Sequence, residues 1–79
     1  MYVDSTKSKI DLIYDEKKDI LYGWLGNVVP SIPENHDWII IRKEIDTNKA
    51  VGFVIYSYNW KKEKGMIKDL PYFKNVVLP

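Results

Sequence analysis

The chain has 79 residues, enough for one small domain that buries only about 60% of the surface its unfolded chain exposes. It contains no cysteine, which excludes a disulfide framework and a thiolate zinc site. The charges nearly cancel, with 12 Lys and Arg against 11 Asp and Glu, so the broad positive field of a dedicated DNA-binding domain is absent.

The N-terminal residues 1–8 are polar and have no periodicity, and we expect a loose tail there. The first twenty residues contain many charges, and no purely apolar run exceeds the four residues 38–41. We therefore expect neither a signal peptide nor a transmembrane helix. These features predict a cytoplasmic protein that does not enter a membrane.

A first β-hairpin is predicted from residue 9 onward. Apolar residues occupy every second position in residues 10–14 and again in residues 20–24, which is typical of strands. Between them we expect a type I turn in which Asp15 accepts a backbone N–H and Lys18 is left-handed. The resulting register pairs Ile13 with Ile20 and places on one face Ile13, Ile20, Tyr22 and Trp24.

A second hairpin is predicted over residues 38–58, with Asp46–Lys49 as its turn and Ile45 facing Ala50. Both of its faces are expected to be apolar. One would carry Ile39, Ile41, Val54 and Tyr56, and the other Trp38, Ile40, Phe53 and Ile55. The intervening residues 26–37 contain Pro30 and Pro33, so we expect a solvated connection there, with a binding loop as the alternative.

The pattern changes after the second hairpin. Asn59 is a suitable N-cap, and Trp60, Ile67 and Leu70 form one stripe of a helix over residues 59–70. The apolar residues 71–79 are expected to dock on the sheet or on another chain. The predicted fold is therefore a single α+β domain over residues 1–79. It consists of a four-stranded antiparallel β-meander of two hairpins in residues 9–58, with one C-terminal helix packed on a face.

The stretches YDEKKDILY and VGFVI carry a resemblance to a known family. Matching positions are Tyr14, Asp15, Asp19, Leu21 and Tyr22, followed by Val51, Gly52, Phe53 and Ile55. Over roughly residues 10–59 the chain resembles the small prokaryotic proteins catalogued as domain of unknown function 2283. Some members of that family are antitoxin-like, which implies neutralisation of a toxin-like partner by protein–protein contact.

Catalytic or metal chemistry has little basis in the sequence. His36 and Asp37, with Glu34 nearby, form the one combination that could indicate acid–base or metal chemistry, but no second His or Cys completes a zinc sphere. The acidic residues Asp15 and Asp46 have ordinary roles in turns. We therefore expect no enzyme, no catalytic or metal site and no cofactor.

One basic cluster supports an alternative function. Aromatic rings beside lysines can stack on bases while the lysines hold phosphates. This alternative, a single-stranded nucleic-acid-binding module, would use Tyr58, Trp60, Lys61, Lys62, Lys64 and Lys68. Acidic neighbours dilute the cluster, so we expect nucleic acid to be the less favoured partner.

The aromatic residues indicate an interaction surface. The eleven aromatic residues (three Trp, six Tyr and two Phe) exceed what one thin core needs, and a single helix covers only one face of a sheet. We expect the second face to bind a partner protein or to form a homodimer through Tyr22, Trp24 and Trp38, unless residues 71–79 cover it. The predicted function is a small intracellular protein-interaction module, antitoxin-like, acting through an aromatic sheet surface.

Overall fold

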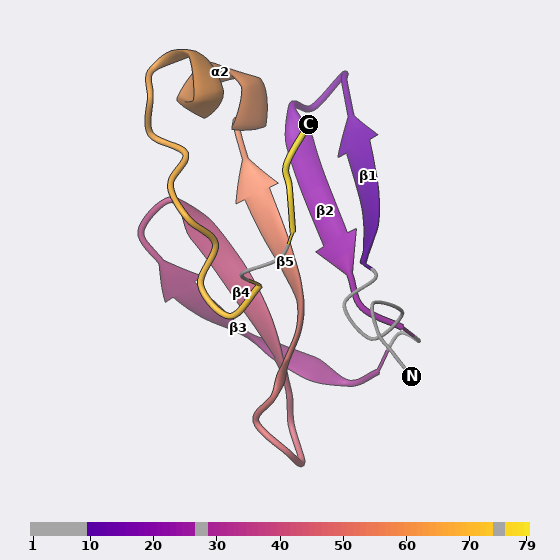
Figure 1. The fold of residues 1–79 in the computed structure, drawn as a ribbon. Helices are drawn as coiled ribbons and strands as arrows, with labels where there is room; N and C mark the ends of the chain where they lie inside the picture. Colours follow the sequence, from indigo (N-terminus) through magenta and orange to yellow (C-terminus); the bar gives the residue numbers. More distant parts are fainter. Residues whose placement is uncertain (1–9, 27–28, 74–75) are drawn as a thin grey trace.

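The computed structural model describes residues 10–26, 29–73 and 76–79, and shows a five-stranded antiparallel sheet with one short helix (Figure 1). The predicted tail at residues 1–8 lies outside the described residues. Along the chain, the elements are β1 (Asp11–Asp15), β2 (Ile20–Trp24), β3 (Ser31–His36), β4 (Ile39–Glu44), β5 (Ala50–Tyr56) and α2 (Tyr58–Glu63). In space the strands follow the order β1-β2-β5-β4-β3, so β5 is central.

The prediction of a four-stranded meander is wrong in two respects. Part of the predicted connection over residues 26–37 is β3, which pairs with β4 at the edge of the sheet. Pro33 is compatible with this position because an edge strand has one side free of ladder hydrogen bonds. In addition, β2 pairs with β5, so the chain crosses from the middle of the sheet to its far edge after β2.

The first hairpin keeps its predicted faces with a different register. Asp15 pairs with Ile20, and Ile13 with Tyr22 instead of Ile20. This shift of two residues leaves every side chain on its predicted face, because the strand period is two. The Asp15 carboxylate accepts the Lys17 N–H at 3.1 Å, as predicted, whereas the left-handed residue is Asp19 (φ 56°) instead of Lys18.

A β-bulge overturns the predicted faces of the second hairpin. Arg42 pairs with Gly52 but Lys43 pairs with Ala50, so Val51 is an extra residue in β5. The extra residue reverses the faces of β5 relative to β4. As a result one face collects the buried side chains Ile39, Ile41, Phe53 and Ile55, which join Leu21 in the core.

Two aromatic rings lie over glycines across the β2–β5 pair. The Phe53 ring covers Gly23 on the core face, where a Cβ would approach the ring to 2.4 Å. On the opposite face the Trp24 ring covers Gly52, where a Cβ would approach the ring to 2.5 Å. The absence of a side chain at each glycine is therefore what allows each ring to pack against the neighbouring strand.

The short helix is capped by a residue forty positions away. Its N-cap residue, Ser57, makes no capping bond with its side chain. Instead the Asp19 carboxylate accepts the backbone N–H groups of Asn59 at 2.8 Å and Trp60 at 3.3 Å, and also the Tyr14 hydroxyl at 2.6 Å. The turn of the first hairpin thus holds α2 on the end of the sheet.

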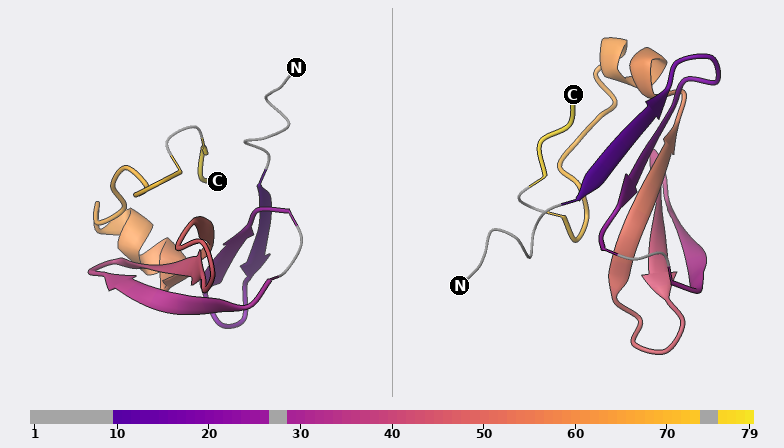
Figure 2. Two further views of the ribbon diagram at one scale, coloured as in Figure 1. Left: turned by 90° about the horizontal axis from the view of Figure 1, so that it is seen from below. Right: turned by 90° about the vertical axis from the view of Figure 1, so that its right-hand side faces the viewer.

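The helix is shorter than the predicted residues 59–70. It ends at Glu63, and Gly65 follows in the left-handed conformation (φ 70°) that commonly terminates helices. The chain after the helix, residues 66–73 and 76–79, is called the C-terminal segment. It runs back along the same face of the sheet, where Leu70 and Phe73 are buried. Figure 2 shows the sheet curving around α2 and this C-terminal segment, which together cover its inner face and leave the outer face open.

Replacing either glycine under a ring should destabilise the protein. We expect Gly23→Ala and Gly52→Ala each to lower the free energy of unfolding by about 1 to 3 kcal/mol, the usual cost of overpacking. Urea unfolding followed by circular dichroism measures it. Gly65→Ala is the control, because the space around Gly65 is open and only the left-handed conformation is penalised, at about 1 kcal/mol. Equal effects at all three positions would contradict the ring contacts.

The cap from Asp19 should make stability depend on pH. Its hydrogen bonds to the Tyr14 hydroxyl and the Asn59 N–H lower the pKa of the Asp19 carboxyl below 3.8. A carboxyl with a depressed folded-state pKa contributes stability that is present above the unfolded pKa and is lost as pH falls through the folded pKa. At pH 7, Asp19→Ala should lower the melting temperature by about 4 to 8 °C, and the difference from the wild type should shrink below pH 4. A difference that is constant from pH 7 to pH 3 would contradict this cap.

Candidate interaction surface

The open face of the sheet carries a continuous apolar row that crosses four strands. The register aligns Ile13, Tyr22, Val54 and Ile40 side by side, one from each of β1, β2, β5 and β4. Ile13 is 64% exposed and Tyr22 is 37% exposed, although both belong to strands of a small domain with little apolar surface to spare. Together with Trp24 and Tyr56 these residues form what we call the open face.

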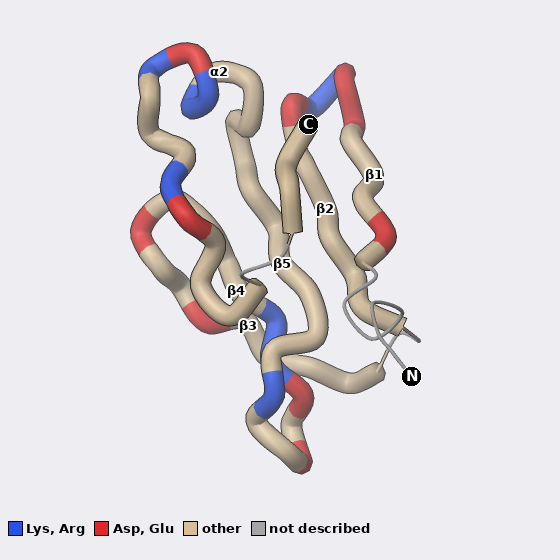
Figure 3. The backbone as a smooth tube through the Cα atoms, in the orientation of Figure 1, with Lys and Arg blue, Asp and Glu red and all other residues tan. Residues whose placement is uncertain are grey.

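Charged residues of the open face lie on β1 and β4, on either side of the uncharged strands β2 and β5. Strands β2 and β5 contain no charged residue, as Figure 3 shows for the middle of the sheet. On the β1 border lie Asp11 and Asp15, which flank Ile13 on the same face of the strand. On the other side lies Arg42, whose guanidinium donates to the hydroxyl and carbonyl of Ser31, both at 3.1 Å. An uncharged centre with a charged rim is the usual anatomy of a protein–protein contact.

Trp24 has an unsatisfied polar group on this face. Its indole nitrogen is buried and has no hydrogen-bond partner in the part of the chain that the structure describes. A buried donor without an acceptor costs free energy. The ring itself is fixed over Gly52, so it presents a rigid aromatic plane.

The three predicted anchor residues lie close to one side of the molecule. Tyr22 and Trp24 are on the open face through their register with Val54 and Gly52. Trp38 is in the β3–β4 turn, where it packs partly on the core and lines a hollow of about 190 Å³ with Ile40, Val54 and Tyr56. Trp38 therefore lies at the end of the open face instead of at its centre. The sequence did not indicate that Ile40 and Val54 lie there. Because the bulge at Val51 was not recognised, the predicted register placed Ile40 and Val54 on opposite faces of the sheet.

Three of the six residues of the alternative basic cluster form side-chain hydrogen bonds within the chain. Tyr58 is a buried core residue whose hydroxyl donates to the Pro79 carbonyl. Lys61 donates to the Trp38 carbonyl at 3.1 Å, and Lys62 to the Pro79 carbonyl at 3.0 Å. Trp60, predicted to pack on the sheet, is 52% exposed instead. The Lys64 ammonium lies 5.9 Å from the centre of the Trp60 ring.

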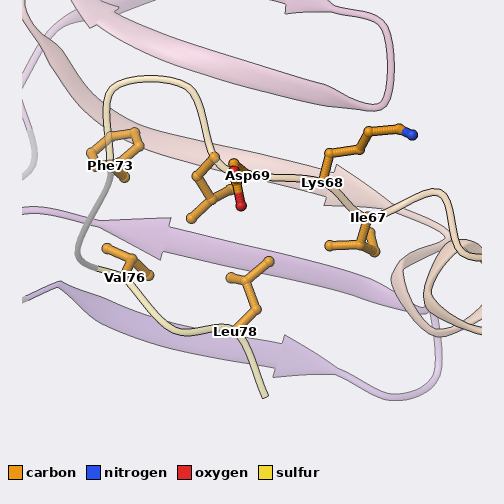
Figure 4. Close-up of a pocket in the computed structure, with 7 residues that line it drawn as sticks. Ile67, Lys68, Asp69, Phe73, Val76 and Leu78 are labelled. Carbon is orange, nitrogen blue, oxygen red and sulfur yellow. The ribbon is translucent and has the colours of Figure 1, made fainter.

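Lys68, the last member of that cluster, lies beside a cavity of about 520 Å³ under the C-terminal segment. Figure 4 shows its amine pointing away from the apolar side chains that line the cavity. Those side chains are Ile67, Leu70, Phe73, Val76 and Leu78. The cluster is therefore dispersed and does not form one basic stripe.

His36 belongs to a polar cluster at the β3 edge of the covered face. Its ring contacts the Glu34 carboxylate, which also bonds the Lys43 ammonium at 2.9 Å. Lys43 in turn donates to the Tyr72 hydroxyl at 3.0 Å. Hydrogen bonds from Lys43 and then His36 lower the pKa of Glu34, while those with Tyr72 and then Glu34 raise the pKa of Lys43. This cluster fastens the C-terminal segment to the sheet.

The polar cluster differs from the predicted pair of His36 and Asp37. Spacing along β3 explains why Glu34 and His36 meet, since they are two residues apart on one face. Lys43 and Tyr72 come from distant parts of the chain, and no local pattern could have indicated them. Among the described residues, no group of three His, Cys, Asp or Glu side chains is placed to hold a metal ion.

No protein-family model, curated protein or solved structure matches the chain. In the described residues, no helix is long and apolar enough to cross a membrane. The residues of the open face are therefore the basis for any functional conclusion.

The two aromatic residues of α2 should respond differently to truncation. We expect Tyr58→Ala to lower the free energy of unfolding by about 3 kcal/mol or more, since its ring is buried against Tyr14 with 5.9 Å between ring centres. Trp60→Ala should change it by less than about 1 kcal/mol, because its ring is half exposed. Thermal and urea melts of the two variants decide the question. A Trp60→Ala variant as unstable as Tyr58→Ala would show that Trp60 is part of the core.

Proposed function

We propose that this protein is a small interaction module that packs its open face against another protein chain. The observation that carries the proposal is the uncharged row of Ile13, Tyr22, Val54 and Ile40 on a face that neither α2 nor the C-terminal segment covers. An exposed apolar row with charged residues on either side is typical of a binding site.

The proposed mechanism is occlusion without a catalytic step. The open face is the outer side of a curved sheet, so contact with the partner centres on the middle strands (Figure 2). Tyr22 and Trp24 would serve as anchors, since large, rigid aromatic side chains contribute most to binding at the centre of interfaces.

The resemblance described above gives this mechanism a biological setting. We propose an antitoxin-like role in a prokaryotic cytoplasm, in which the open face blocks the working surface of a toxin-like partner. No metal or cofactor takes part in this mechanism. Its support consists of the open face and the stretches around Tyr14 and Gly52 that resemble the family.

A second candidate function is binding of single-stranded nucleic acid. It is supported by the exposed Trp60 ring and the neighbouring Lys64 ammonium, which could stack on a base and contact a phosphate. It is less favoured because Lys61 and Lys62 already donate to main-chain carbonyls. Binding through lysines would weaken steeply with salt, whereas binding through the open face would change little.

Charge substitutions on the open face should remove partner binding from a folded protein. We expect Tyr22→Glu or Val54→Glu to weaken binding to a toxin-like partner protein by about 30-fold or more, the effect of losing a hot-spot residue. Isothermal titration calorimetry measures it. Ile32→Glu is the matched control, because Ile32 is also an exposed apolar strand residue but points to the opposite side from Val54.

The same variants distinguish the two candidate functions. The proposal predicts that Trp60→Ala and Lys64→Ala leave partner binding unchanged. It would be overturned if the open-face variants bound like the wild type while Trp60→Ala abolished binding to a labelled single-stranded oligonucleotide.

A further inference from the structure

We infer that the open face pairs with a second copy of this chain, face to face, about a two-fold axis that runs along β5. This inference rests on the proposed role of the open face as a protein contact and names the partner that the face itself specifies. It is supported by the strand order and the distribution of charge.

The strand order is symmetric about β5, with two strands on each side. Rotation by 180° about β5 places β2 over β4 of the second copy and β1 over β3, with each facing pair running in the same direction. Side chains of the apolar row then face side chains of the same row in the second copy. Val54 faces Val54 of the second copy near the axis, and Tyr22 faces Ile40.

Charge distinguishes this arrangement from the other face-to-face two-fold. An axis across the strands would stack β1 on itself and bring Asp11 against Asp15 of the second copy. Like charges facing each other disfavour that arrangement. With the axis along β5, β1 faces β3 of the second copy, so the acidic residues of β1 do not face one another.

The same axis brings a cation to an aromatic ring. Trp24, Gly52 and Arg42 lie in one row across β2, β5 and β4. After rotation, Arg42 of the second copy faces the Trp24 ring, with no side chain from Gly52 between them. A guanidinium over an indole ring is a favourable contact, so this row of the open face is complementary to itself.

The size of the face sets the strength of the pairing. Five strands about 4.8 Å apart and about five residues long give a face of roughly 20 by 17 Å, below the area of a standard specific interface. Curvature of the sheet confines contact to its central strands (Figure 2). We therefore expect a reversible dimer with a dissociation constant in the micromolar range, which a tighter partner could displace.

Single cysteines provide the test, because the chain has none of its own. With a short bis-maleimide at high micromolar protein concentration, Val54→Cys should cross-link to itself. Tyr22→Cys alone should not, whereas an equal mixture of Tyr22→Cys and Ile40→Cys should give a mixed dimer. Ile32→Cys, on the opposite side of the sheet, is the control that should remain uncross-linked. Circular dichroism confirms that each variant is folded.

The other outcomes decide the orientation of the axis, the second copy as partner, and the proposed function. Self-cross-linking of Tyr22→Cys would replace the axis along β5 with the axis across the strands. A wild-type protein that sediments as a 9.3 kDa monomer at high micromolar concentration, with no cross-linking of Val54→Cys, would exclude the second copy as partner. In that case, continued loss of partner binding by Tyr22→Glu would retain the proposed function. Cross-linking at Val54 with normal partner binding by Tyr22→Glu would instead retain the dimer and exclude the proposed function.

Discussion

The structure depends on two aromatic rings that each lie over a glycine of the neighbouring strand. Phe53 covers Gly23 on one face, and Trp24 covers Gly52 on the other. The four residues are two adjacent register pairs between β2 and β5. A slip of one residue would move each ring onto a position that carries a side chain, so these contacts fix the register where distant parts of the chain meet.

This central pairing also determines which surface remains available for binding. Val51, the extra residue in β5, directs Phe53 and Ile55 to the same side as Ile39 and Ile41, and that side becomes the core. The helix and the C-terminal segment are both used to cover that core. Within the described residues, the other face keeps its apolar row in contact with solvent, which in a domain of this size favours a role in association.

Local periodicity predicted the parts of the fold that depend on alternation. It predicted the strands around Leu12 and Tyr22. The assignment of Tyr22 and Trp24 to one face was correct because a register error of two residues does not change the face. It could not indicate the bulge at Val51, since one extra residue leaves no mark in an apolar strand. Nor could it indicate β3, where Pro33 and polar residues conceal an edge strand whose pairing comes from β4. The cap from Asp19 and the contact of Lys43 with Tyr72 join distant segments, so neither leaves a local signal.

The most direct test of the account is a nuclear Overhauser experiment on a mixture of isotope-labelled and unlabelled protein, which detects only contacts between chains. The account predicts intermolecular signals from the methyl groups of Ile40 and Val54 on the open face, and none from Ile41 and Ile55 in the core. Intermolecular signals from Ile41 or Ile55, or from surfaces away from the open face, would contradict the division of the sheet into a covered face and a binding face.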